Sequence, residues 1–151
     1  MTTAATGDAG GCIFCAALSN NSELILYRGK HVFIILNKFP YNNGHLMLVP
    51  NRHISTLSQL SDEELDELGS FIRTTEIAIN EAYKPNGINV GINVGRSAGA
   101  GVPDHIHVHA VPRWDGDTNF MTVVGETRVV PEEPSQTLER LQPIFSRILD
   151  N

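Results

Sequence analysis

Three histidines stand at every second position in one short segment: His105, His107 and His109. Side chains of a β-strand alternate between its two faces, so a strand here would project all three imidazoles onto one face. Small apolar residues supply the opposite face: Ile106, Val108 and Ala110. Imidazole acts as a nucleophile, a proton carrier or a metal ligand near neutral pH. The alternation therefore predicts a reaction centre, and attack on a phosphorus atom is one reaction that a neutral imidazole could carry out there.

A glycine-rich run at residues 95–101 comes directly before these histidines. Glycines allow backbone N–H groups to approach phosphate oxygens closely. No G-K-[ST] sequence follows, and the run does not fit G-x-G-x-x-G, so neither a P-loop nor a dinucleotide fingerprint is present. Beside the three histidines, the run favours a phosphate-binding loop over a simple turn. The alternative is that the three histidines are solvated or hydrogen-bonded structural residues on an exposed strand. Their alternation and their position next to the glycine-rich run would then be a coincidence.

The two cysteines of the chain, Cys12 and Cys15, have the spacing of half a zinc site. No second C-x-x-C pair exists to complete a four-thiolate site, so two histidines would have to finish the tetrahedron. His53 and His105 are the candidates. Two buried, inert thiols or a redox pair are the alternatives, and the spacing alone leaves them open.

Hydrophobic patterning predicts the elements that position these side chains. Apolar, β-branched segments at residues 23–28, 31–37, 45–49 and 88–94 are typical of strands, and the second and third form an antiparallel hairpin. Ser61 and Glu64 form a capping box for a long helix that ends before Pro85. A second helix is expected around 135–149. The pattern indicates an α+β fold: an antiparallel sheet with a long central helix and a C-terminal helix.

Length and composition set further limits. The 151 residues suit one domain, expected at 12–151, after a disordered leader at 1–11. A net charge of −6 argues against electrostatic binding to a nucleic-acid backbone. No apolar run reaches the roughly 18 residues of a membrane span, and the first residues lack the features of a signal peptide. We therefore expect a cytoplasmic protein that binds neither nucleic acid nor membrane.

The pattern H-x-H-x-H with two following apolar residues, at 105–111, resembles the signature of the histidine triad (HIT) superfamily of nucleotide-binding hydrolases and transferases. Residues 12–15 look like the opening of many prokaryotic members, and residues 44–53 look like their central hairpin. Residues 111–121 resemble the branch that includes the bacterial diadenosine tetraphosphate phosphorylases. The resemblance covers roughly residues 12–131, most of the chain.

This resemblance implies a role for each matching position. His107 matches the nucleophile that forms a nucleotidyl-histidine on the α-phosphate, and His109 matches a histidine that contacts phosphate. His45 is expected to support the triad histidines without itself contacting the substrate. The implied nucleotide-binding residues are Phe33 and Ile35 at the base, Asn37 at the ribose, and Asn93, Ala100, Gly101 and His109 at the phosphates.

Three positions depart from the usual family pattern. The family commonly places an acidic residue on the ribose hydroxyls, where Asn37 stands here. Many hydrolase members carry Gln and Ser where Ala100 and Gly101 stand. The missing Ser hydroxyl bears on which leaving group is preferred.

Zinc-containing relatives use two cysteines, a histidine after the hairpin and the first triad histidine as ligands. Cys12, Cys15, His53 and His105 fill those positions here. The resemblance thus implies a structural Zn²⁺ site with no open coordination position. It also implies a homodimer.

The expected function is that of a nucleotidyl hydrolase or transferase acting at the α-phosphate of nucleoside or dinucleoside polyphosphates, with an adenine-type nucleotide as partner. Water as acceptor gives a hydrolase, and inorganic phosphate gives a phosphorylase that releases a nucleoside diphosphate. The alternative is a nucleotide-binding regulatory or interaction protein with weak phosphoramidase-type activity. A zinc-stabilised scaffold is a third interpretation.

Overall fold

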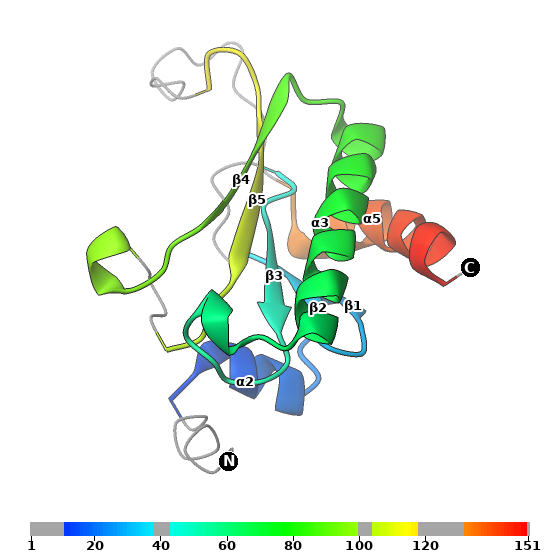
Figure 1. Cartoon of the computed structure of the whole chain (residues 1–151). Helices are drawn as coiled ribbons and strands as arrows, with labels where there is room; N and C mark the ends of the chain where they lie inside the picture. The colour runs from blue at the N-terminus through cyan, green and yellow to red at the C-terminus, as the bar shows by residue number, and fades with distance from the viewer. Residues whose placement is uncertain (1–10, 38–42, 100–103, 118–131, 151) are drawn as a thin grey trace.

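A five-stranded antiparallel sheet organises the molecule, with strand order β1-β2-β3-β5-β4 (Figure 1). The computed structural model describes residues 11–37, 43–99, 104–117 and 132–150. The strands are β1 (Ile25–Arg28), β2 (Val32–Leu36), β3 (Leu46–Pro50), β4 (Gly87–Ile92) and β5 (Val108–Arg113). The helices are α2 (Ile13–Ser19), α3 (Asp62–Tyr83) and α5 (Pro134–Leu149), with short 3₁₀ turns η1 (Leu57–Gln59) and η2 (Arg96–Ala98). The α+β fold with an antiparallel sheet and two long helices is confirmed.

The hairpin of β2 and β3 forms the centre of the sheet and separates two apolar layers. Val32 pairs with Pro50 and Leu36 pairs with Leu46, so every residue of both strands is paired and buried. One face of the hairpin packs under α3 and α5, which also contact each other. The other face packs against α2. Burial on both faces explains why the two strands are continuous apolar runs rather than alternating ones.

The long helix begins where the capping box predicts. The Ser61 side chain accepts a hydrogen bond from the Glu64 backbone N–H, and the Glu64 carboxylate accepts one from the Ser61 N–H. The helix ends at Tyr83, and Lys84 follows in the left-handed region at φ 50°, directly before Pro85. Proline disfavours helical backbone in the preceding residue, which explains the stop.

The histidine-rich strand is shorter than the alternation predicts. β5 begins at Val108, so His105 and His107 precede it and only His109 belongs to it. The reason is a change of partner: the Ile106 N–H donates to the carbonyl of Ile54 at 2.7 Å, outside the sheet ladder. β4 ends opposite Val108, where Ile92 pairs with it. The predicted strand at 88–94 likewise ends at Ile92.

Several sequence-based expectations concern residues outside the described ranges. These are the leader apart from Gly11, the loop positions Ala100 and Gly101, and residues 118–121 of the segment that resembles the phosphorylase branch. Among the described helices, none combines the length and the apolar character needed to cross a membrane.

Candidate functional site

The nucleophile candidate, His107, is a buried imidazole whose tautomer is set by the backbone. Its Nδ1 lies 3.0 Å from the carbonyl oxygen of His105, and a carbonyl only accepts, so Nδ1 carries the proton. The other ring nitrogen, Nε2, therefore holds a lone pair. Burial lowers the pKa of His107 below its usual value, which keeps the ring neutral at neutral pH. The geometry prepares one nitrogen of this ring for nucleophilic attack.

His109 and His45 continue the cluster on the other side of His107. The rings of His107 and His109 have centroids 4.8 Å apart, and those of His45 and His109 are 5.2 Å apart. His45 Nε2 lies 3.0 Å from His109 Nδ1. Burial lowers the pKa of His45 to about 4, with a smaller contribution from His109, so both rings are neutral near pH 7. His45, which is expected to support the triad, thus contacts His109 directly.

The four predicted metal ligands converge on one point. Cys12 Sγ lies 3.2 Å from His105 Nδ1, and Cys15 Sγ lies 3.3 Å from His53 Nδ1 and 3.6 Å from His105 Nδ1. All four donor atoms lie within 4.8 Å of one another. In a tetrahedral zinc site, with bonds of about 2.3 Å to sulfur and about 2.0 Å to nitrogen, neighbouring S and N donors are roughly 3.5 Å apart. The donor set and its spacing therefore fit Zn²⁺.

Local structure fixes each of these donors. Cys12 is the N-cap of α2, and its Sγ accepts a hydrogen bond from the Cys15 N–H, so both thiols lie at the same helix end. The Nε2–H of His105 donates to the Pro50 carbonyl at 2.8 Å, which leaves Nδ1 unprotonated for a metal. Burial, together with the Cys12 thiol, raises the pKa of Cys15 to about 12, and a cation held by these donors would lower it.

The segment that carries His53 is attached to α3 by an ion pair. Arg52 Nε and Nη2 each donate to the carboxylate of Glu64 at 2.8 Å, a two-point contact with a side chain that is only 5% exposed. The Arg52 hydrogen bond is the largest contribution that lowers the pKa of Glu64 to about 2. Glu64 also closes the capping box, so a single carboxylate joins the start of α3 to the segment with the metal ligand.

The expected base-binding residues lie in the interior. Phe33 is fully buried and Ile35 is 5% exposed, and both belong to the apolar layer beneath α2. Asn37, expected at the ribose, directs its side-chain Nδ2 to Nδ1 of His45 at 2.9 Å. Asn93 is exposed just beyond β4, and its Nδ2 donates to the Gly99 carbonyl at 3.5 Å across the glycine-rich turn.

Phe14 is a site residue that the sequence reasoning missed. Its side chain is 2% exposed, and its ring lies 5.6 Å from the ring of His105 and 4.8 Å from that of His107. Position between the two cysteines did not single it out, because Ile13 lies there too and is 63% exposed. Phe14 therefore contacts both His105, one of the four candidate metal ligands, and His107, the nucleophile candidate.

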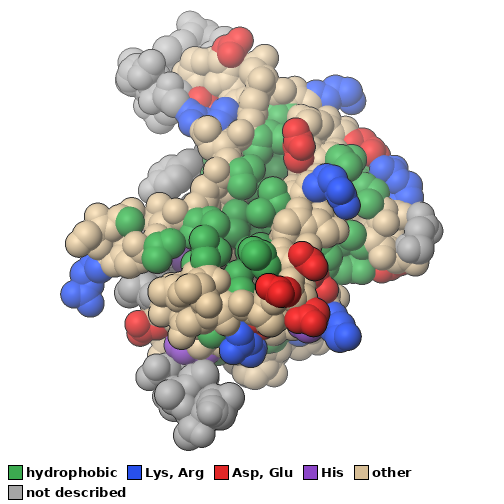
Figure 2. All heavy atoms as spheres, in the orientation of Figure 1, with side chains coloured by type: hydrophobic (Ala, Val, Ile, Leu, Met, Phe, Trp, Pro, Cys, Tyr) green, Lys and Arg blue, Asp and Glu red, His purple; other side chains and the backbone are tan. Residues whose placement is uncertain are grey.

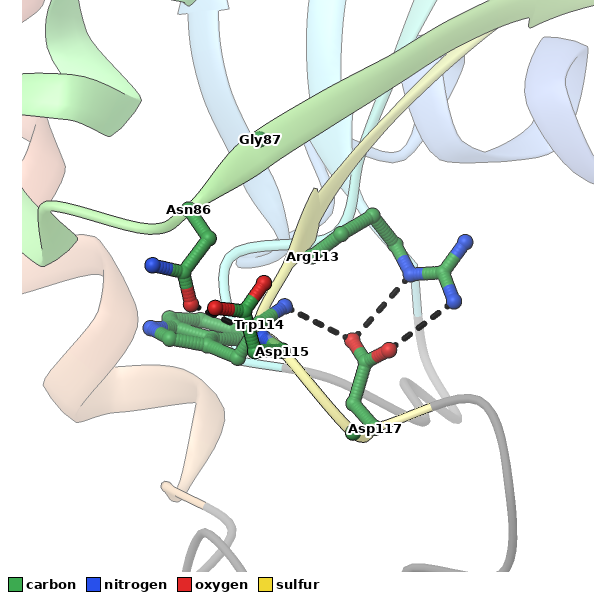
Figure 3. Close-up of a pocket in the computed structure, with 7 residues that line it drawn as sticks. Asn86, Gly87, Arg113, Trp114, Asp115 and Asp117 are labelled. Carbon is green, nitrogen blue, oxygen red and sulfur yellow. Dashed lines mark hydrogen bonds and ion pairs between the residues drawn. The ribbon is translucent and has the colours of Figure 1, made fainter.

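The far end of β5 forms a separate hollow of about 320 Å³ (Figure 3). Asp117 accepts hydrogen bonds from the Arg113 guanidinium and from the Trp114 N–H, and the Asp115 N–H donates to the side chain of Asn86. These bonds fold the chain after β5 into a turn. They hold the beginning of the segment whose sequence resembles the phosphorylase branch.

Comparison with known proteins identifies the family and the fold. The sequence matches the HIT domain over residues 19–116. The chain belongs to the HIT family. It is 47% identical over 130 residues to the AP-4-A phosphorylase of Mycobacterium tuberculosis, covering 86% of this chain and 67% of the relative.

Solved HIT structures share the architecture. A zinc-bound histidine triad family protein from Mycobacterium smegmatis superposes with a TM-score of 0.73 at 23% identity, covering 93% of this chain and 96% of that one. A hypothetical histidine triad nucleotide-binding protein from Sulfolobus tokodaii gives a TM-score of 0.69 at 28% identity, with 93% and 97% covered. The first comparison speaks to the fold alone. Together they support the HIT fold for this chain.

Proposed function

We propose that this HIT protein is an enzyme that transfers a nucleotidyl group from a dinucleoside polyphosphate, through a covalent intermediate on His107. The observation that carries the proposal is the buried, neutral His107, whose Nδ1–H is held by the His105 carbonyl while Nε2 keeps its lone pair. The similarity to a protein named AP-4-A phosphorylase supports an adenine dinucleotide as substrate. A relative from Schizosaccharomyces pombe, 33% identical over 93 residues, is named an asymmetrical bis(5'-nucleosyl)-tetraphosphatase.

The first half of the proposed reaction forms the intermediate. Nε2 of His107 attacks the α-phosphorus, a P–N bond forms, and the P–O bond to the rest of the phosphate chain breaks. The imidazole becomes cationic and keeps its Nδ1 proton, which the His105 carbonyl stabilises. His109 lies beside His107 and donates a hydrogen bond to a phosphate oxygen as negative charge develops there.

The second half returns the nitrogen lone pair to His107. An oxygen of the acceptor attacks phosphorus, the P–N bond breaks, and a proton from an attacking water is released to solvent. Water as acceptor releases a nucleoside monophosphate, whereas inorganic phosphate releases a nucleoside diphosphate. With diadenosine tetraphosphate the leaving group is ATP in both cases, so the second product identifies the acceptor.

The product assay that tests this proposal uses diadenosine tetraphosphate with and without inorganic phosphate. We expect ATP and ADP when phosphate is present, and little turnover without it. ATP and AMP in equal amounts under both conditions would contradict phosphorolysis and favour the hydrolase. Tight nucleotide binding without turnover would favour the regulatory interpretation.

We further propose that Cys12, Cys15, His53 and His105 hold one structural Zn²⁺. Four protein donors fill a tetrahedral site, so no position remains for substrate, and the cation contributes fold stability rather than Lewis-acid chemistry. Free thiols are consistent with a reducing compartment, and we propose a cytoplasmic location. We also propose that residues 12–151 form a single domain.

A homodimer is proposed on the exposed edge of the sheet. In the described part of the chain β4 pairs with β5 alone, and apolar side chains gather on the face where β4 and α3 lie (Figure 2). The exposed ones on these elements include Ile77 at 44% and Val90 at 47%. Sedimentation velocity should give the dimer mass for the unaltered protein and a shift toward monomer for Val90→Lys. A monomer at micromolar concentration would contradict the dimer.

A further inference from the structure

One chain of hydrogen bonds runs from Asn37 through His45 to His109. Asn37 directly follows β2 and His45 directly precedes β3, and the Asn37 backbone N–H donates to the His45 carbonyl at 3.1 Å. The Asn37 side-chain Nδ2 lies 2.9 Å from Nδ1 of His45. Nε2 of His45 lies 3.0 Å from Nδ1 of His109. The base of the central hairpin is thus connected by side chains to the last triad histidine.

The side-chain amide of Asn37 determines which group donates in each of these hydrogen bonds. An amide nitrogen donates and does not accept, so Nδ1 of His45 must accept. Burial lowers the pKa of both rings, and a neutral ring that accepts at Nδ1 carries its proton on Nε2. His45 therefore donates from Nε2 to Nδ1 of His109. His109 in turn carries its proton on Nε2.

We propose that Asn37 is a positioning residue that fixes the tautomers of His45 and His109, so that His109 presents an Nε2–H donor beside the nucleophile. This inference rests on the proposed function, in which that donor meets a phosphate oxygen. It differs from the ribose contact that the family resemblance implies for Asn37. It also gives a reason for an amide where the family commonly has an acid.

A carboxylate at position 37 would reverse the direction of these hydrogen bonds. It only accepts, so Nδ1 of His45 must carry a proton. If His45 stays neutral, its Nε2 becomes an acceptor, His109 donates from Nδ1, and the N–H beside His107 is lost. If His45 instead becomes cationic, the carboxylate has raised its pKa. Either result differs from the unaltered protein.

The experiment reads the tautomers directly, by ¹⁵N-detected histidine NMR on the full chain at pH 8 without substrate. We expect both His45 and His109 as Nε2–H tautomers in the unaltered protein. Asn37→Asp should move His45 to the Nδ1–H or the cationic form, and kcat/KM should fall at least about 10-fold, since a wrong histidine tautomer weakens catalysis. Asn80→Asp, an exposed change on α3, is the matched control and should alter neither.

Asn37→Ala provides a second test if the Asp variant folds poorly. It removes the donor without adding an acceptor, so His45 should show a mixture of tautomers. His45 protonated at Nδ1 in the unaltered protein, or unchanged tautomers in both variants, would overturn the inference. Because the spectra need no substrate, this result is independent of whether diadenosine tetraphosphate is turned over.

Discussion

His107→Asn is expected to remove turnover of diadenosine tetraphosphate while nucleotide binding changes only a few-fold. The Asn side chain can still donate to the carbonyl of His105, as Nδ1 of His107 does, so the local fold is preserved. It has no nucleophilic ring nitrogen to attack phosphorus. We expect kcat to fall by at least about 10³-fold, since removal of a covalent nucleophile can cost about 10⁶-fold in kcat. Product formation by chromatography and AMP binding by calorimetry measure the two effects separately.

A matched control and a covalent trap sharpen this prediction. His31→Asn makes the same chemical change at a histidine outside the cluster, whose backbone N–H is bonded to Glu67, and should leave kcat unchanged. Unaltered protein quenched in alkaline denaturant, in which the P–N bond survives, should show the mass of one adenylyl group on the peptide that contains His107. Undiminished turnover in His107→Asn, or an adduct on another residue, would refute the assigned nucleophile.

Local sequence signals predicted the secondary structure well where one element carries its own start signal or a continuous apolar run. The capping box of Ser61 and Glu64 located the start of α3, and the apolar run after His31 located β2. The same reasoning extended the histidine strand too far. Alternation of side chains can persist in an extended segment whose backbone bonds go elsewhere, as the Ile106 N–H does to Ile54. The position where a ladder ends depends on the partner strand, which local sequence does not contain.

At the site, too, some features were predictable from the sequence and others were not. Spacing and family resemblance named the four metal donors, and the fold brings their ligand atoms within 4.8 Å of one another. The hydrogen bonds that orient the site histidines were not predictable, because they are made by backbone groups or by side chains that belong to no recognisable motif. The carbonyls of Pro50 and His105, which orient the His105 and His107 rings, leave no trace in a sequence motif. The resemblance implies a ribose contact for Asn37, and the contact of its side chain with His45 has no counterpart in a sequence motif.

Cys12→Ala is expected to abolish zinc binding and to destabilise the fold by more than about 4 kcal/mol, well beyond an ordinary point substitution. A structural zinc site contributes its binding free energy to folding, because the unfolded chain does not assemble the four donors. Inert buried thiols predict a much smaller loss. Metal analysis of the purified protein and urea unfolding with and without a chelator distinguish these cases.

Combining the chelator with Cys12→Ala makes this test decisive, because both remove the contribution of zinc binding to the free energy of folding. In the unaltered protein a chelator should lower the stability to that of Cys12→Ala, and in the variant it should have no further effect. Ile13→Ala, at a neighbouring position that is 63% exposed, should keep both the zinc and the chelator response. A redox pair would respond to reductant and not to chelator. Zinc loss should also reduce turnover, since His105 is both a proposed ligand and the residue whose carbonyl orients His107.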